Sequence, residues 1–138
     1  MRTILFVAAL VLVSPLSAQT SPASQRMSVL TGNQLLRGLD NCDRLDRGQK
    51  QAAADTDFCF LATGYVEGAA NAMFVTLPKA FVERTGVQNG QVVDVVHKYL
   101  VVHPESRNDA SVNLIGSALI EEWGTPESKK QHHVHETR

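Results

Sequence analysis

The twenty residues from Phe58 to Leu77, FCFLATGYVEGAANAMFVTL, form the longest apolar stretch that follows the N-terminal leader. Their larger apolar side chains recur at spacings of three and four, the period of a helix with one buried stripe. The residues of this stripe are Phe58, Leu61, Ala62, Tyr65, Ala69 and Met73. The sequence therefore predicts a long helix that is buried in an all-helical domain.

The small residues of this stretch repeat every fourth position and fall along one edge of the expected helix. In a lipid bilayer such spacing marks a helix–helix contact, but the acidic Glu67 and the polar Asn71 interrupt it here. Each glycine costs about 1 kcal/mol of helix propensity relative to alanine, so we expect another backbone to pack closely there. The residues predicted to make this contact are Gly64, Tyr65, Gly68 and Ala72.

The first 18 residues have the features of a cleavable secretory signal peptide. Arg2 precedes an unbroken apolar run over residues 4–13, and Pro15 and the small residue Ala18 follow it. The run is too short to span a bilayer, so an uncleaved membrane anchor is the less favoured alternative. Cleavage after Ala23 is a second option. We expect a periplasmic protein.

Cleavage removes Arg2 from the 13 Lys and Arg residues and none of the 14 acidic residues, which leaves a net charge near −2. This balance argues against a nucleic acid or an anionic membrane as partner. The polar composition of residues 19–27 predicts a disordered lead-in, and one helical domain is expected over residues 28–124. Residues 125–138 are expected to form a flexible, histidine-containing tail, because Pro126 should end the preceding helix.

Cys42 and Cys59 are the only cysteines in the chain. Thr31 and Gln34 have the spacing of a capping box, so a first helix should begin at Thr31 and lead toward Cys42. Because secretion exposes thiols to an oxidising compartment, we expect a Cys42–Cys59 disulfide that ties this helix to the central one. The alternative is a catalytic thiol, which requires a base beside it and a lowered pKa.

Two further helices are expected after the central one. Residues 90–103 are rich in valine, which favours a strand, but their apolar side chains follow a helical spacing. We therefore predict a helix that is capped by Asn89 and ended by Pro104. A last helix is expected from about residue 108 to Gly124. The predicted fold is a small all-α bundle of about four helices with one disulfide.

Several short motifs, spread over most of the mature chain, also have a recognisable order. They are Gly32-Asn33-Gln34-Leu35-Leu36, Gly64-Tyr65-x-x-Gly68, Leu77-Pro78, Val92-Val93-Asp94-Val95-Val96-x-x-Tyr99-Leu100, His103-Pro104 and Ala118-Leu119. In this order and spacing they resemble the Rap/Tai family of type VI secretion immunity proteins. Thr76 and Thr125 replace, as a pair, two cysteines that members often carry, and Asn71 replaces an aspartate.

The resemblance implies a homodimeric, secreted helical protein that binds and inhibits a secreted peptidoglycan amidase. Such inhibition needs a complementary surface and no chemistry of its own, so we expect neither enzymatic activity nor a cofactor. The predicted contact is the loop from Pro78 to Asn89. The loop residues assigned to the partner are Lys79, Phe81, Glu83 and Arg84. In the alternative interpretation, this loop is a connector whose Phe81 caps the core.

Three patterns resemble catalytic or metal sites, and each has a simpler interpretation. His97 lies three residues after Asp94, a spacing that could orient a general base, but a solvated helix face is the preferred interpretation. Glu67 stands alone among small residues, and a hydrogen bond between packed helices is the preferred account. The tail histidines with the spacing of metal ligands are His132, His133 and His135. No other ligand lies near them in sequence, so no metal site is predicted.

Two other classes of function stay open. The first is a periplasmic stress or chaperone-like binding protein on the same scaffold, with five histidines available to titrate in acid. The second is a small hydrolase or redox enzyme. It is disfavoured because the sequence contains no phosphate loop, His-Glu-x-x-His pair or Gly-x-Ser-x-Gly elbow.

Overall fold

The computed structural model describes residues 30–82 and 86–136, and gives only the backbone for residues 133–136. The expected signal peptide and lead-in, together with Glu83 and Arg84, lie outside the described residues. The described part contains five α-helices and two short 3-10 helices, and no strand beyond two isolated bridges. They are α1 (Gly32–Asp46), α2 (Ala53–Thr76), η1 (Pro78–Ala80), α3 (Asn89–Val102), η2 (Pro104–Ser106), α4 (Ser111–Trp123) and α5 (Pro126–Glu136).

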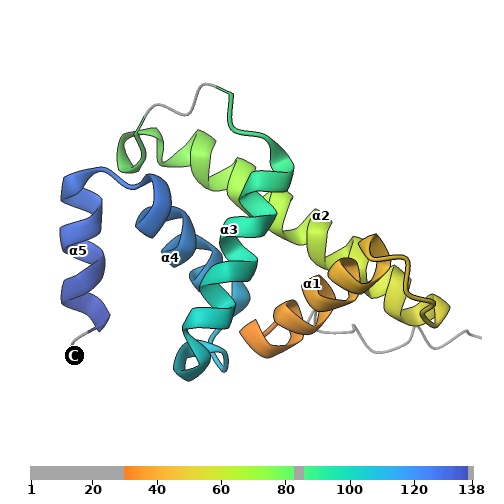
Figure 1. The fold of residues 1–138 in the computed structure, drawn as a ribbon. Helices are drawn as coiled ribbons and strands as arrows, with labels where there is room; N and C mark the ends of the chain where they lie inside the picture. The colour runs from red at the N-terminus through yellow and green to blue at the C-terminus, as the bar shows by residue number, and fades with distance from the viewer. Residues whose placement is uncertain (1–29, 83–85, 137–138) are drawn as a thin grey trace, which may run out of the picture.

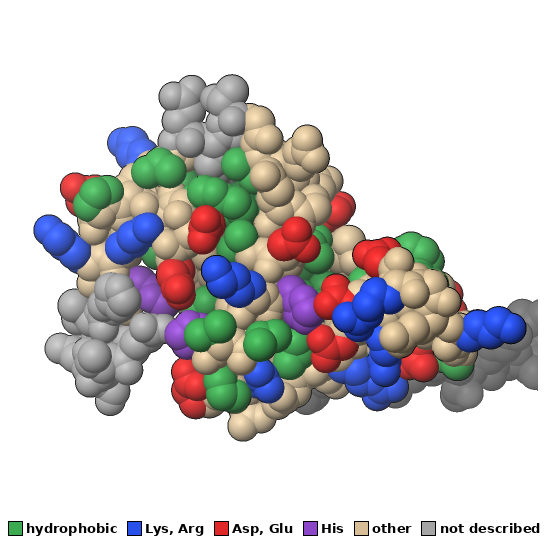
Figure 2. Space-filling view, viewed as in Figure 1, with side chains coloured by type: hydrophobic (Ala, Val, Ile, Leu, Met, Phe, Trp, Pro, Cys, Tyr) green, Lys and Arg blue, Asp and Glu red, His purple; other side chains and the backbone are tan. Residues whose placement is uncertain are grey.

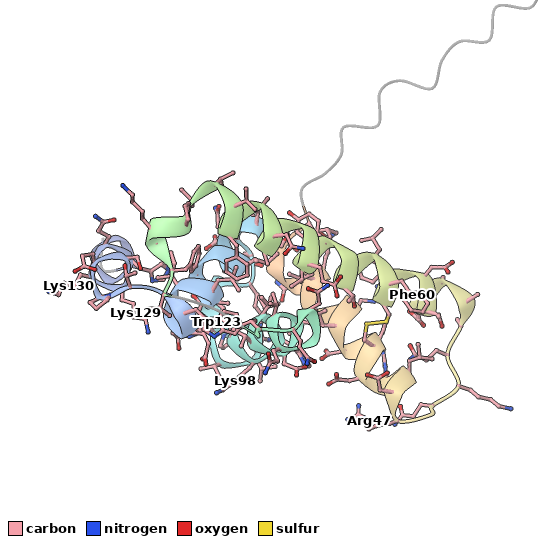
Figure 3. The ribbon with its side chains drawn as sticks, turned by 90° about the horizontal axis from the view of Figure 1, so that it is seen from above. Arg47, Phe60, Lys98, Trp123, Lys129 and Lys130 are labelled. Atoms are coloured by element: carbon pink, nitrogen blue, oxygen red, sulfur yellow. A yellow bond between two sulfur atoms is a disulfide. The ribbon has the colours of Figure 1, made fainter. Side chains whose placement is uncertain are left out.

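The longest helix, α2, runs along the molecule, and the other helices lie on one side of it (Figure 1 and Figure 3). Seen from above, α1 covers its N-terminal half, while α3 and α4 lie beside the rest of it (Figure 3). The last helix, α5, packs on α4 at the far end from α1. The all-α class predicted from the sequence is confirmed.

Helix starts follow the local signals of the sequence with one change. The capping box at α1 is confirmed: Gln34 donates its backbone N–H to Thr31 Oγ1 at 3.3 Å, and Gln34 Oε1 accepts from Thr31 N–H at 2.9 Å. The valine-rich segment is a helix, α3, as predicted. However, Asn89 is its first residue rather than its cap, because Gln91 Oε1 accepts from the preceding Gln88 N–H at 2.9 Å.

The buried stripe of α2 is offset from the predicted one. Leu61, assigned to the core by its spacing, is 54% exposed. The fully covered positions of α2 are Cys59, Ala62, Val66 and Ala70. Small residues take this face because α1 crosses α2 very closely: a Cβ built on Gly38 of α1 would lie 2.5 Å from Ala62 Cβ. Larger side chains would force the two backbones apart.

The predicted close packing at the small-residue edge of α2 is not made by any residue in the part of the chain that the structure describes. Gly64, Gly68 and Ala72 are exposed, and a Cβ added at either glycine would have no described atom within 4 Å. Tyr65, from the same motif, is half-buried and packs against the core. A close approach of two backbones does occur, but on the opposite face of α2, where Gly38 of α1 lies against Ala62.

The segment expected to be a flexible tail forms α5. Pro126 is its first residue, where the fixed φ of proline suits a helix and its missing N–H is not needed. Thr125 Oγ1 accepts the Ser128 N–H at 3.3 Å, and Ser128 Oγ donates to the Ala80 carbonyl at 2.8 Å. These bonds give the helix a start and a tie to η1, so the described bundle has five helices rather than four.

The predicted disulfide is confirmed. Cys42 of α1 and Cys59 of α2 are bonded across 17 residues, with 5.0 Å between their Cα atoms. The bond lies next to the crossing of the two helices and closes the connection between them. Both thiols are consumed, so neither is a catalytic nucleophile in this form.

Replacing Gly38 and Gly64 by alanine should have opposite effects. Gly38→Ala should destabilise the fold by about 1–3 kcal/mol, because its Cβ collides with Ala62 and with the Phe58 backbone. Gly64→Ala has open space and should stabilise by up to about 1 kcal/mol through helix propensity. Urea unfolding followed by circular dichroism measures both; equal effects would contradict the close crossing.

Removing the disulfide should destabilise the protein without changing its fold. The chain-entropy model gives about 3 kcal/mol for a loop of 17 residues. The double variant Cys42→Ser, Cys59→Ser should therefore unfold at a lower urea concentration with an unchanged helical spectrum. Reduced wild-type protein serves as the matched control and should unfold with the double variant. An unfolding midpoint insensitive to reductant would contradict the prediction.

Candidate binding groove between α3 and α4

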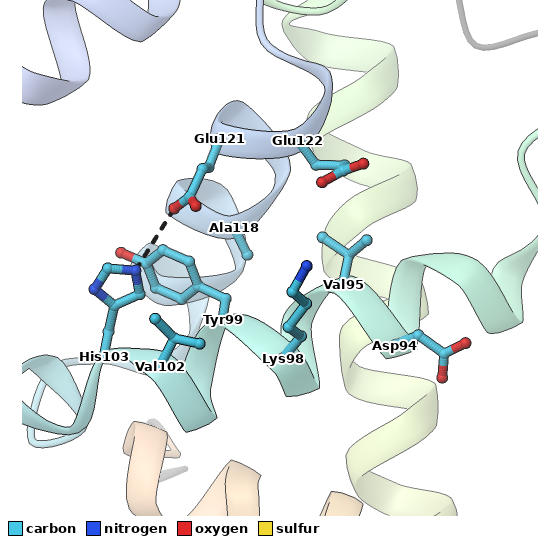
Figure 4. A pocket seen from close by; sticks show the side chains of 9 residues that line it. All are labelled: Asp94, Val95, Lys98, Tyr99, Val102, His103, Ala118, Glu121 and Glu122. Carbon is cyan, nitrogen blue, oxygen red and sulfur yellow. Dashed lines mark ion pairs between the residues drawn. The ribbon is translucent and has the colours of Figure 1, made fainter.

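A hollow of the described chain lies between the C-terminal half of α3 and the end of α4 (Figure 4). Its volume is about 280 Å³. Apolar and charged side chains both line it, a mixture that is also found at protein interfaces. The lining residues are Asp94, Val95, Lys98, Tyr99, Val102, His103, Ala118, Glu121 and Glu122.

His103 fixes one end of this groove. It ends α3, and its ring stacks on Tyr99 with 4.3 Å between ring centroids. Its Nδ1 lies 3.2 Å from Glu105 Oε1, and its Nε2 lies 3.6 Å from Glu121 Oε2. The imidazole thus links α3, η2 and α4, which sequence spacing did not indicate because the three residues come from separate elements.

Glu105 stays ionised more readily than an ordinary glutamate. A hydrogen bond from its own backbone N–H lowers its pKa below the ordinary value of 4.5, and the hydrogen bond with His103 lowers it further. The carboxylate is largely exposed to solvent, so its contribution to stability is small.

The groove lining carries an excess of negative charge. Three carboxylates, Asp94, Glu121 and Glu122, face one ammonium, that of Lys98. Figure 2 views this side of the molecule, where acidic, basic and histidine side chains stand among apolar ones over α3. Such a lining favours a cationic element on whatever binds there.

A second, separate hollow lies where α1, α2 and α3 meet beside the disulfide, with a volume of about 300 Å³. His97 lines it and pairs with α1: its Nε2 is 2.8 Å from Asp40 Oδ1 and its Nδ1 is 3.6 Å from Asp43 Oδ2. His97 therefore has two carboxylate partners on another helix. Its spacing in the sequence had instead suggested Asp94 as the partner. The pairing with Asp40 and Asp43 ties α1 to α3.

Glu67 also lines this second hollow and is half-buried. The expected hydrogen bond from Glu67 to a neighbouring helix is not formed with any residue that the structure describes. Of the tail histidines, His132 has its Nε2 2.7 Å from Ser117 Oγ on α4. The side chains of His133 and His135 are outside the description. Within the described residues no group of three His, Cys, Asp or Glu side chains could hold a metal ion.

The residues of the loop after α2 differ in their exposure to solvent. Lys79 is exposed on η1, whereas Phe81 is 6% exposed and packs edge-on against Phe74 with 5.0 Å between ring centroids. Backbone hydrogen bonds fasten the loop to the end of α4: Val82 N–H donates to the Trp123 carbonyl at 2.8 Å. Phe81 thus lies in the core, as expected if the loop is a connector whose Phe81 caps the core. Contact of this loop with a partner stays a prediction.

Comparisons with known proteins return no family model, no curated protein and no solved structure that matches this chain.

The pKa of Glu105 sets the sign of one pH effect. Its folded pKa is depressed, so the carboxylate stabilises the fold at neutral pH, and this contribution is lost as pH falls from 4.5 through the lower folded value. Urea titrations should therefore give wild type a higher free energy of unfolding than Glu105→Gln at pH 7. The difference between the two proteins should shrink in acid. In a His103→Ala background the difference should be smaller at every pH. A difference independent of pH would contradict this account.

Proposed function

We propose that this protein is a periplasmic immunity-type protein that binds and inhibits a secreted peptidoglycan amidase. The proposal rests on the resemblance of its motifs to the Rap/Tai family and on how those motifs sit in the fold. It includes cleavage of the first 18 residues and export to the periplasm. The resemblance also implies a homodimer. The protein supplies a surface and no catalysis.

The observation that carries the proposal is that the first motif is bonded to the segment that follows the His103-Pro104 motif. Gly32 N–H donates to the Asp109 carbonyl at 3.0 Å, and Asn33 N–H donates to the Arg107 carbonyl at 2.8 Å. A Cβ on Gly32 would lie against the Leu114 side chain. The start of α1 and the segment after His103-Pro104 therefore need each other. Sequence features that depend on one another structurally support a shared scaffold more strongly than separate short matches.

The α3–α4 groove is the surface that we assign to the amidase. Its lining includes the exposed Val102 and carries unequal charge, so it offers both apolar area and electrostatic selection. This replaces Phe81 as the apolar anchor, because that ring is already used by the core. Lys79 is exposed on η1, which backbone hydrogen bonds fasten to the C-terminal end of α4 outside the groove lining.

A chaperone-like binding protein is the second candidate, and one observation favours it. The outer face of α2 exposes large apolar side chains, among them Phe60 at 64% and Val75 at 79%. Exposed apolar surface of this kind binds unfolded chains without much selectivity. It does so with many clients at low occupancy, whereas an inhibitor binds one partner at equal stoichiometry.

The test starts with affinity capture of the tagged protein from the periplasm of its own bacterium, with bound proteins identified by mass spectrometry. We expect one cell-wall hydrolase at near one-to-one stoichiometry, and inhibition of its release of peptides from purified peptidoglycan. Many clients, more numerous at acidic pH, would instead favour the chaperone. Recovery of no hydrolase would remove the proposal.

Charge reversal in the groove then locates the surface. Glu122→Lys should weaken inhibition of the captured amidase at least about tenfold, since rim and core charges of an interface set both attraction and partner choice. Glu127→Lys is the matched control, because that residue is exposed on α5 outside the groove. Equal inhibition by both variants would move the contact away from the α3–α4 groove.

A further inference from the structure

One face of α2 is uncovered by the described part of the chain. Its large apolar side chains are exposed at both ends, with small residues between them. The exposed fractions are 64% for Phe60, 54% for Leu61, 79% for Val75 and 55% for Leu77, the residue after the helix. Between Asp57 and Lys79 no exposed residue of this face is charged. Monomeric proteins rarely leave so long a strip of mainly apolar residues in water, and the polar Asn71 is exposed within it.

Four residues of this face are arranged symmetrically about Gly68. Leu61 and Val75 each lie seven positions from it, and Gly64 and Ala72 each lie four positions from it. Two large side chains therefore flank a shallow centre in which no described atom lies within 4 Å of a Cβ added at either glycine. A face with this symmetry is complementary to itself when two helices run antiparallel.

We propose that this face binds the same face of a second copy, with the two α2 helices antiparallel and crossing at Gly68. A two-fold axis at Gly68 sets Leu61 of each copy against Val75 of the other. The absence of side chains at the centre lets the two backbones approach, as in small-residue helix pairs. The inference rests on the homodimer of the proposed function and names its interface, which is this face of α2 and not the α3–α4 groove.

Charge selects the antiparallel direction. Asp57 is exposed near the N-terminal end of the strip, and Lys79 is exposed just beyond its C-terminal end. An antiparallel pair brings each Asp57 toward the Lys79 end of the other copy. It also places the two helix dipoles side by side in opposite directions, which is the favourable arrangement. A parallel pair would place like charges together at both ends.

The area of the strip sets the expected strength. A helix of 24 residues is about 36 Å long, and a contact about 10 Å wide then covers roughly 400 Å² on each copy. That is about half of a standard stable interface. We therefore expect a reversible dimer with a dissociation constant of about 1–100 μM.

A membrane is the competing occupant. α2 passes the length and composition criteria for a membrane-spanning helix. Its other face, however, is bonded through Cys59 and packed on α1, so insertion would require the domain to open. A lipid surface would contact only the outer strip, and it would do so without preference for the pairing of Leu61 with Val75.

The test is sedimentation equilibrium of the protein as the bacterium processes it, over a range of concentrations. Wild type should dimerise in the micromolar range. Leu61→Lys and Val75→Glu should each raise the dissociation constant at least about tenfold, because each places a charge against an apolar side chain. The double variant should return within about threefold of wild type, since the introduced charges then face each other twice across the two-fold axis.

Val101→Lys is the matched control. It removes an exposed valine, 52% accessible, from α3 rather than α2, and should leave the dissociation constant unchanged. Gly68→Leu should abolish the dimer by filling its centre, while its helical spectrum and unfolding midpoint confirm an intact fold. A wild-type monomer at 100 μM, or a dimer without rescue in the double variant, would overturn the proposal. So would binding of the monomer to phosphatidylglycerol vesicles that Leu61→Lys abolishes.

Discussion

The close crossing of α1 over α2 is the constraint on which the rest of this structure depends. Gly38 and Ala62 bring the two backbones together, and the Cys42–Cys59 bond joins the helices just beyond that point. Because small residues occupy this contact, α2 must turn its larger side chains elsewhere. Some of them, such as Met73 and Phe74, pack against α4 and the loop after α2, and others, such as Leu61, face solvent.

Much of the fold was predictable because its signals are local. The capping box at Thr31, the helical spacing of the valines in α3 and the pairing of the two cysteines each depend on neighbouring residues or on compartment. The orientation of α2 was not predictable in the same way. Its apolar residues are too evenly spread around the helix to identify one buried face. Packing with other helices buries Val66 and leaves Leu61 exposed, and sequence periodicity carries no information about that packing. The start of α5 was missed because proline is read as the end of a helix although it also suits the first position of one, as Pro126 does here.

The candidate groove was largely hidden in the sequence. His103, Glu105 and Glu121 belong to three elements that meet only when α3 and α4 pack together, and no spacing rule links them. His97 is an instructive contrast: its nearest acid in sequence is Asp94, but its partners in the fold are Asp40 and Asp43. Phe81 likewise looked available in a polar loop, and the fold buried it against Phe74. In each case tertiary contact decided what a correctly identified side chain does.

The disulfide has a consequence for survival among proteases. The connection between α1 and α2 is exposed from Arg47 to Lys50 and contains Gly48 with a φ of 71°, so it is the natural place for a protease to bind and cut. Cys42 and Cys59 lie on either side of it. A chain cut there keeps both pieces covalently joined, with α1 still seated on α2. In an extracytoplasmic compartment, such a protein can be nicked and still retain its fold until the bond is reduced.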